Sequence, residues 1–169
     1  MVGFGTAAVV GALVGAPNTP ALWVGTAAAC ILPDLDLASE LIGKKGPQFH
    51  RNASHSLIVL GGLIGLGILA VRVFGIPVDP RHGIAWIAAL LSHPLLDVLA
   101  TGPQLGSQGY GIALFWPVSK RRLYIQRPLY ETMDLSKVRS PGDLWDGVRP
   151  ELIKLGPVTV AALVFAALI

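Results

Sequence analysis

His93 and Asp97 lie four positions apart inside an otherwise apolar run of the sequence. In a helix this spacing puts both side chains on one face, and Thr101 lies one turn further along the same face. Ionisable side chains inside a membrane helix are energetically costly and usually face a functional partner or a cavity. Imidazole and carboxylate groups are also common ligands of divalent metals. The pair therefore predicts metal-binding or catalytic chemistry, and a hydrogen bond that only ties two helices together is the alternative.

Two other polar segments carry groups of the same kind. Asp34 and Asp36 follow the first apolar region, and their alternation sends both carboxylates to one side of an extended chain. His50, Arg51 and His55 directly precede the next apolar run. Imidazoles beside a guanidinium suit the binding of a metal ion and of an anion. For the aspartate pair alone, a solvated turn at the membrane interface is an equally good interpretation.

The elements that must position these residues are apolar helices. Hydrophobic residues make up 53% of the 169 residues and charged residues only 14%, whereas an ordinary soluble domain has about 25% charged residues. We predict an all-α integral membrane protein, a single domain over residues 1–169 that forms a small bundle of about four to five hydrophobic helices. The expected helices are 3–16, 20–32, 56–76, 83–100 and 156–169, and the expected polar loops are 33–55 and 101–155.

Both polar loops are basic, and two predicted helices separate them, so they fall on the same side of the membrane. An excess of Lys and Arg in short loops marks the cytoplasmic side. We therefore expect a protein integral to the cell inner membrane, with its long loop region facing the cytoplasm. His55, at the start of one helix, and Asp97, near the end of the next, then lie at the same depth. His82, at the opposite end of that second helix, is expected on the surface.

The predicted topology brings six metal-ligating side chains to one membrane face. They suit one or two divalent ions such as Zn, Mn, Fe or Mg, and a site of this kind activates water for attack on a bond. Cys30 is the single cysteine, so the ligands are nitrogen and oxygen atoms. The expected metal ligands are Asp34, Asp36, His55, His93 and Asp97. His50 or a carboxylate is expected to be the general base, and Arg51 and Asp97 to take part in catalysis.

Cationic and hydroxyl side chains near the same face could hold an anionic group of a substrate. The candidates for substrate binding are Arg51, Thr101, Lys120, Arg121 and Arg122. For the three consecutive basic residues, contact with anionic lipid headgroups is the favoured alternative. The net charge is +3, but the basic residues are those that topology already explains, and the sequence has no nucleic-acid-binding motif. We expect membrane lipids as partners and no nucleic acid.

Four motifs in order resemble the family of membrane-bound metal-dependent hydrolases, also described as LexA-binding, inner-membrane-associated hydrolases. Residues 32–36 resemble its Leu-Pro-Asp-x-Asp motif, residues 50–56 its His-Arg-Gly-x-Thr-His-Ser, residues 92–97 its Ser-His-x-x-x-Asp, and residues 114–119 the Leu-Trp-Pro-Phe-Ser that follows. Order and spacing agree from about residue 5 to 120. The resemblance implies a metal-dependent hydrolase and names no substrate.

The chain departs from the family pattern at three positions. Ala7 occupies the place of a histidine near the N-terminus, Ala100 that of a threonine, and Leu37 that of a histidine present in some members. Two functions therefore stay open: a hydrolase that acts on a phosphoester or lipid-derived substrate, and a non-catalytic membrane protein whose His/Asp cluster is structural and whose basic loop binds lipid or a partner. A transporter is disfavoured, because transport sites tend to lie near the middle of the bilayer.

Overall fold

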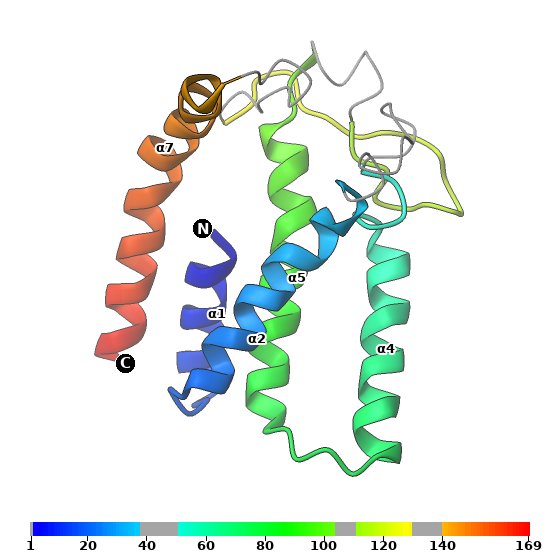
Figure 1. Ribbon diagram of the computed structural model, residues 1–169, viewed down its shortest axis with the longest axis vertical. Coiled ribbons are helices and arrows are strands. Elements are labelled where there is room, and N and C mark those ends of the chain that lie inside the picture. The colour runs from blue at the N-terminus through cyan, green and yellow to red at the C-terminus, as the bar shows by residue number, and fades with distance from the viewer. Residues whose placement is uncertain (1, 38–50, 104–110, 130–139) are drawn as a thin grey trace.

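The computed structural model describes residues 2–37, 51–103, 111–129 and 140–169, although the side chains of Asp36, Leu37 and Leu144 are not among those described. Within these ranges the chain forms five α-helices, one 3-10 helix and no strand (Figure 1). The elements are α1 (Val2–Leu13), α2 (Pro20–Ile31), η1 (Leu32–Leu37), α4 (Leu57–Val73), α5 (Pro80–Ala100) and α7 (Pro141–Leu168). The predicted all-helical class is confirmed for the described part of the chain.

Helix α5 is the centre of the bundle. It packs against α1 and α2, and α1 in turn packs against α7, whereas α4 contacts α5 over a shorter stretch and stands apart in Figure 1. Small residues allow these close contacts between helices. A Cβ atom on Gly3 would overlap the Sγ atom of Cys30, and one on Gly25 would overlap the indole of Trp86. The α1–α2–α5 packing therefore depends on these two glycines.

The last helix begins much earlier than predicted. It starts at Pro141 rather than at residue 156, so the expectation that 101–155 is loop throughout is wrong for its final part. Ser140 accepts a hydrogen bond from the Asp143 backbone N–H at 3.2 Å, and the Asp143 carboxylate accepts one from the Ser140 N–H at 2.9 Å. This capping box, with proline at the first helical position, starts the helix.

The other helix boundaries differ from the predictions by a few residues. The helix predicted at 83–100 begins at Pro80, because the Asp79 carboxylate caps it by accepting from the Arg81 backbone N–H at 2.9 Å. The helix predicted at 56–76 ends at Val73, and Gly75 follows with a φ of 61°, a conformation that glycine adopts readily.

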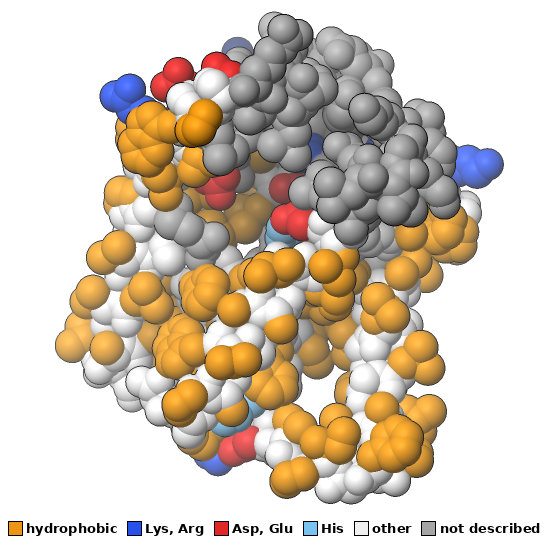
Figure 2. All heavy atoms as spheres, in the orientation of Figure 1, with side chains coloured by type: hydrophobic (Ala, Val, Ile, Leu, Met, Phe, Trp, Pro, Cys, Tyr) orange, Lys and Arg blue, Asp and Glu red, His pale blue; other side chains and the backbone are white. Residues whose placement is uncertain are grey.

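Two helices, α5 and α7, are long and apolar enough to cross a membrane, and α1, α2 and α4 are shorter apolar helices. Hydrophobic side chains cover most of the visible helical surface in Figure 2. Many large apolar residues are exposed on these helices, among them Leu66 and Leu69 on α4 and Val160 on α7. An exposed apolar surface of this extent is typical of helices that contact lipid.

His82 is buried, which corrects the prediction that it lies on the surface. Its side chain is 6% exposed, and its Nε2 atom lies 2.7 Å from the Pro17 backbone oxygen and 3.4 Å from the Thr19 hydroxyl. The ring also stacks on Trp86, with 5.8 Å between centroids. The α1–α2 connection folds back over the start of α5, and His82 ties the two together.

Candidate metal centre

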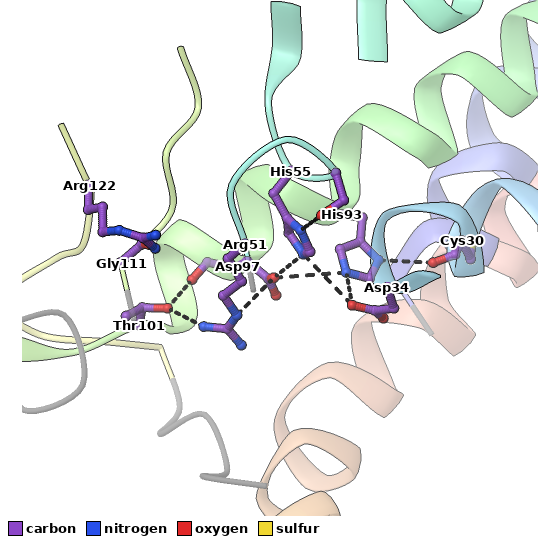
Figure 3. A network of polar contacts seen from close by, with 10 residues as sticks. Cys30, Asp34, Arg51, His55, His93, Asp97, Thr101, Gly111 and Arg122 are labelled. Carbon is purple, nitrogen blue, oxygen red and sulfur yellow. Dashed lines mark hydrogen bonds and ion pairs between the residues drawn. The ribbon is translucent and has the colours of Figure 1, made fainter. Parts of the chain in front are cut away.

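Four of the predicted site residues meet at the end of the bundle opposite His82. Asp34 comes from η1, His55 from the segment just before α4, and His93 and Asp97 from the last turns of α5 (Figure 3). The prediction that His55 and Asp97 lie at the same depth is confirmed, because His55 Nε2 and Asp97 Oδ2 are 3.0 Å apart.

Three of these side chains point one ligand atom each toward a common position. The His93 Nε2 atom is 3.4 Å from Asp34 Oδ1, and the His55 Nε2 atom is 3.7 Å from the same oxygen. Ligand atoms of Asp34, His55 and His93 all lie within 4.8 Å of one another. The two imidazole rings are arranged edge to face, with centroids 5.4 Å apart.

Hydrogen bonds on the far side of each ring orient the imidazoles. The Nδ1 atom of His93 lies 3.0 Å from the Cys30 backbone oxygen, and since a carbonyl only accepts, Nδ1 is the donor and carries the proton. Nε2 is then the nitrogen that faces the carboxylates of Asp34 and Asp97. His55 Nδ1 is 3.0 Å from the Ser54 hydroxyl, which also leaves Nε2 facing the cluster. Metal-binding histidines usually have a partner of this kind on the second nitrogen.

The loop that carries His55 is held in place by the fourth matched motif. Ser56 caps α4 by accepting from the backbone N–H groups of Ile58 and Val59, and its own hydroxyl donates to the Trp116 backbone oxygen at 2.5 Å. The Leu57 N–H donates to the Leu114 oxygen at 2.9 Å. Ser56 is therefore the N-cap of α4. Sequence reasoning assigned no role to residues 114–119, and the structure shows that they fix the start of α4.

Asp97 lies between the imidazoles and a guanidinium. Its Oδ2 atom is 3.8 Å from Arg51 Nε and 3.9 Å from His93 Nε2. Asp97 itself belongs to none of the three-residue ligand groups among the described residues. Thr101 follows the last residue of α5. Its hydroxyl donates to the Asp97 backbone oxygen at 2.7 Å and accepts from Arg51 Nη1 at 3.1 Å. Arg51 is thus held by both residues, from a backbone position with φ of 61°.

The predicted basic triplet separates into two parts. Arg122 is half-buried and lies near Arg51, and its guanidinium donates to the Gly111 backbone oxygen at 2.8 Å and to the Asn52 side-chain oxygen at 2.6 Å. Burial, with a smaller contribution from the Arg51 charge, lowers the pKa of Arg122. Lys120 and Arg121 are exposed instead. The structure brings Arg51, Thr101 and Arg122 together, whereas Lys120 and Arg121 face away from the buried cluster.

A cavity of about 240 Å³ adjoins the cluster between α1, α2, α5 and α7. Asp34, His93 and Asp97 line it, together with Glu151 of α7. Glu151 is not among the site residues predicted from the sequence. The i, i+4 spacing from Glu151 to the apolar Leu155 was the available signal, but the helix start at Pro141 was not recognised.

His50 and the Asp36 side chain fall outside the described residues. Ala7 is fully buried among Leu22, Ala85 and Ala89, in the helix packing below the cluster. At this family histidine position, the chain therefore has a small side chain in a tightly packed apolar core.

The donor set fits a divalent ion. Ligand atoms bound at about 2.1 Å to one tetrahedral ion lie about 3.4 Å from each other, and the distances from Asp34 Oδ1 to the two imidazole nitrogens are 3.4 and 3.7 Å. Two imidazoles and one carboxylate are ligands that suit Zn, Mn or Fe. The cavity that Asp34 and His93 line leaves room for water or substrate.

Comparison with known proteins identifies the family. The family described as YdjM inner membrane protein matches residues 1–169, the whole of the sequence. No curated protein and no solved structure matches the chain. The match supports a membrane location, in agreement with two helices of spanning length. The chain belongs to the YdjM inner membrane protein family.

Proposed function

We propose that this protein is a membrane-bound metal-dependent hydrolase. The observation that carries the proposal is the convergence of Asp34 Oδ1, His55 Nε2 and His93 Nε2 from three separate segments. A divalent ion, when bound, would polarise the bond under attack and lower the pKa of a water molecule. Asp36 and Asp97 stay predicted ligands, and the metal identity is left open among Zn, Mn, Fe and Mg.

The protein's own residues supply the binding of an anionic group. Arg51 is held by Asp97 and Thr101, and Arg122 lies beside it, so two guanidinium groups stand next to the cluster. Guanidinium groups bind phosphate oxygens in two-pronged fashion. Because the site lies at the end of apolar helices, a phosphoester that is part of a lipid or derived from one is the substrate class that fits. The basic loops favour the cytoplasmic side for this site.

The second candidate is a non-catalytic membrane protein, and one observation favours it. Asp97 contacts His55 and Arg51 in the manner of a structural ion-pair network, and such a network alone would tie α4 to α5. In that case the cluster stabilises the bundle without metal. Thermal unfolding with and without a chelator separates the two candidates, because only a metal site loses stability on chelation.

Hydrolysis of a panel of phosphoesters and carboxylic esters by detergent-purified protein tests the proposal. The panel is run with Zn, Mn and Mg, on the wild type and on Asp97→Ala. We expect the variant to lose activity on the order of 10- to 100-fold, the range for residues that orient metal ligands. Asp79→Asn is the matched control, since Asp79 lies at the other end of the same helix. Equal hydrolysis by the wild type and Asp97→Ala would contradict the mechanism.

A further inference from the structure

Glu151 is the one carboxylate that α7 brings to the cavity beside the cluster, among the described residues. It is half-buried, whereas Asp143 and Asp146 on the same helix are exposed. It lines the same cavity as Asp34, His93 and Asp97, but it belongs to none of the ligand groups found in the described part of the chain.

The packing of α7 fixes the face on which Glu151 lies. Leu155, one turn later, is 8% exposed and packs against Ala100 at the end of α5 and against Val2. Residues four apart in a helix share a face, and both Glu151 and Leu155 line the cavity. The Lys154 ammonium, which donates to the Leu129 backbone oxygen at 2.7 Å, further fixes this turn of α7. Glu151 therefore lines the cavity from a turn of α7 that is anchored on two sides.

The cavity has room for the reactants. A cavity needs a volume of about 10–15 Å³ to hold one water molecule, and this cavity has a volume of about 240 Å³. Asp34, His93 and Asp97 border one part of it, Glu151 another, and Val2, Gly3 and Leu96 supply apolar lining. A general base must reach the proton of the attacking water directly or through one further water, and Glu151 lines the cavity in which such a water would lie.

We propose that Glu151 is the general base of this site. This inference rests on the proposed hydrolase function and assigns the role that sequence analysis left to His50 or a carboxylate. A water proton passes to the Glu151 carboxylate as the water oxygen forms its bond to phosphorus and the bond from phosphorus to the leaving oxygen breaks. The protonated Glu151 then gives that proton to the leaving oxygen, so the products are an alcohol and a phosphate and the carboxylate is restored.

The test compares Glu151→Gln with the wild type and with Asp146→Asn, a matched change of an exposed carboxylate on the same helix. Three quantities are measured: metal per chain, the affinity of the metal-loaded protein for inorganic phosphate, and kcat on the substrate found in the panel. We expect Glu151→Gln to keep its metal and lower kcat on the order of 100-fold or more. Phosphate should bind Glu151→Gln at least as tightly as the wild type, because a negative charge facing the anion is removed. Asp146→Asn should match the wild type in all three.

Each other outcome overturns the inference in a recognisable way. An unchanged kcat in Glu151→Gln, with an active wild type, removes Glu151 from the reaction and leaves the hydrolase proposal standing. Loss of metal together with kcat makes Glu151 a ligand rather than a base. A metal-loaded wild type that hydrolyses nothing on the panel overturns the hydrolase proposal itself, and the general-base role with it.

Discussion

Helix α5 carries a histidine toward each end, His82 near its start and His93 in its last turns. His82 makes contacts that join two segments, whereas His93 belongs to the candidate metal site. At the start, His82 faces a backbone carbonyl and a hydroxyl of the α1–α2 connection. At the end, His93 uses one nitrogen on the Cys30 carbonyl and turns the other toward Asp34 and Asp97. Figure 2 shows acidic and histidine side chains at both ends of an otherwise apolar surface.

The difference lies in what surrounds the second nitrogen. The polar groups around His82 tie the α1–α2 connection to α5 and complete a structural contact. Around His93, a second imidazole and two carboxylates converge instead, so the donor atoms face one another. A histidine in an apolar helix therefore does not by itself indicate a metal site. Several ligand atoms that converge from separate segments distinguish a candidate metal site from a structural hydrogen bond between helices.

The largest effect is expected from His55→Ala at the cluster end. His55 is fully buried, and its Nε2 atom is one of the three converging ligand atoms. Metal at 100 times its dissociation constant should stabilise the wild type by about 2.7 kcal/mol, and the variant should show no metal-dependent shift in Tm. Thermal unfolding with and without added metal measures this. If metal raised the Tm of His55→Ala as much as that of the wild type, the cluster end of α5 would not be a metal site and would not differ in function from the His82 end.

His82→Ala should behave in the opposite way. The change leaves the Pro17 carbonyl without its partner and opens the packing against Trp86. An unsatisfied buried polar group costs about 1–3 kcal/mol, so Tm without metal should fall. The shift in Tm on adding metal should stay as in the wild type. If His82→Ala abolished the metal-dependent shift in Tm, His82 would be needed for metal binding and its role would not be purely structural.

Arg51→Lys should separate anion binding from metal binding within the cluster end. Lysine keeps the charge but cannot contact Asp97 and Thr101 with a planar fork. Charge-assisted hydrogen bonds of this kind contribute about 1.5–3 kcal/mol, which corresponds to roughly a 10-fold or greater loss of phosphate affinity. Calorimetric titration of inorganic phosphate into the metal-loaded protein checks this, with metal content as the control. Unchanged phosphate affinity would remove Arg51 from the anion site.

The smallest effect is expected from Asp79 at the helix start. Hydrogen bonds from the Arg81 side chain and backbone lower the pKa of Asp79 from 3.8 to about 2. A carboxylate with a lowered pKa contributes stability above its unfolded value and loses that contribution as pH falls through the folded value. Asp79→Asn should therefore lower Tm slightly at pH 7, and the difference should disappear as pH falls from about 4 to 2. A difference in Tm that persists below pH 2 would contradict this.

The cluster was predictable because its geometry follows from topology. Antiparallel helices joined by a short turn bring the start of α4 and the end of α5 to one level, which places His55 beside Asp97. The breaker at Pro33 ends α2 at the same level, and Asp34 follows it in η1. Each of these inferences needs only helix periodicity, apolar length and helix-breaking residues.

The remaining features depend on tertiary contacts that a single sequence does not display. Pro150 and Pro157 indicate helix ends, yet both lie inside α7, so the predicted loop 101–155 included Glu151. His82 was assigned to the surface because nothing in the sequence shows the connection at Pro17 folding over it. Both errors arise from packing between segments distant in sequence, which overrides local signals.

The central claim is that the cluster at the end of α5 binds a divalent ion. The most direct test is the metal content of detergent-purified protein, for the wild type and for the His93→Ala, Asp97→Ala double variant, after incubation with Zn, Mn or Mg. We expect close to one ion per wild-type chain and loss of that ion in the double variant. Absence of metal from the wild type under all three conditions would contradict it and favour the structural role of the cluster.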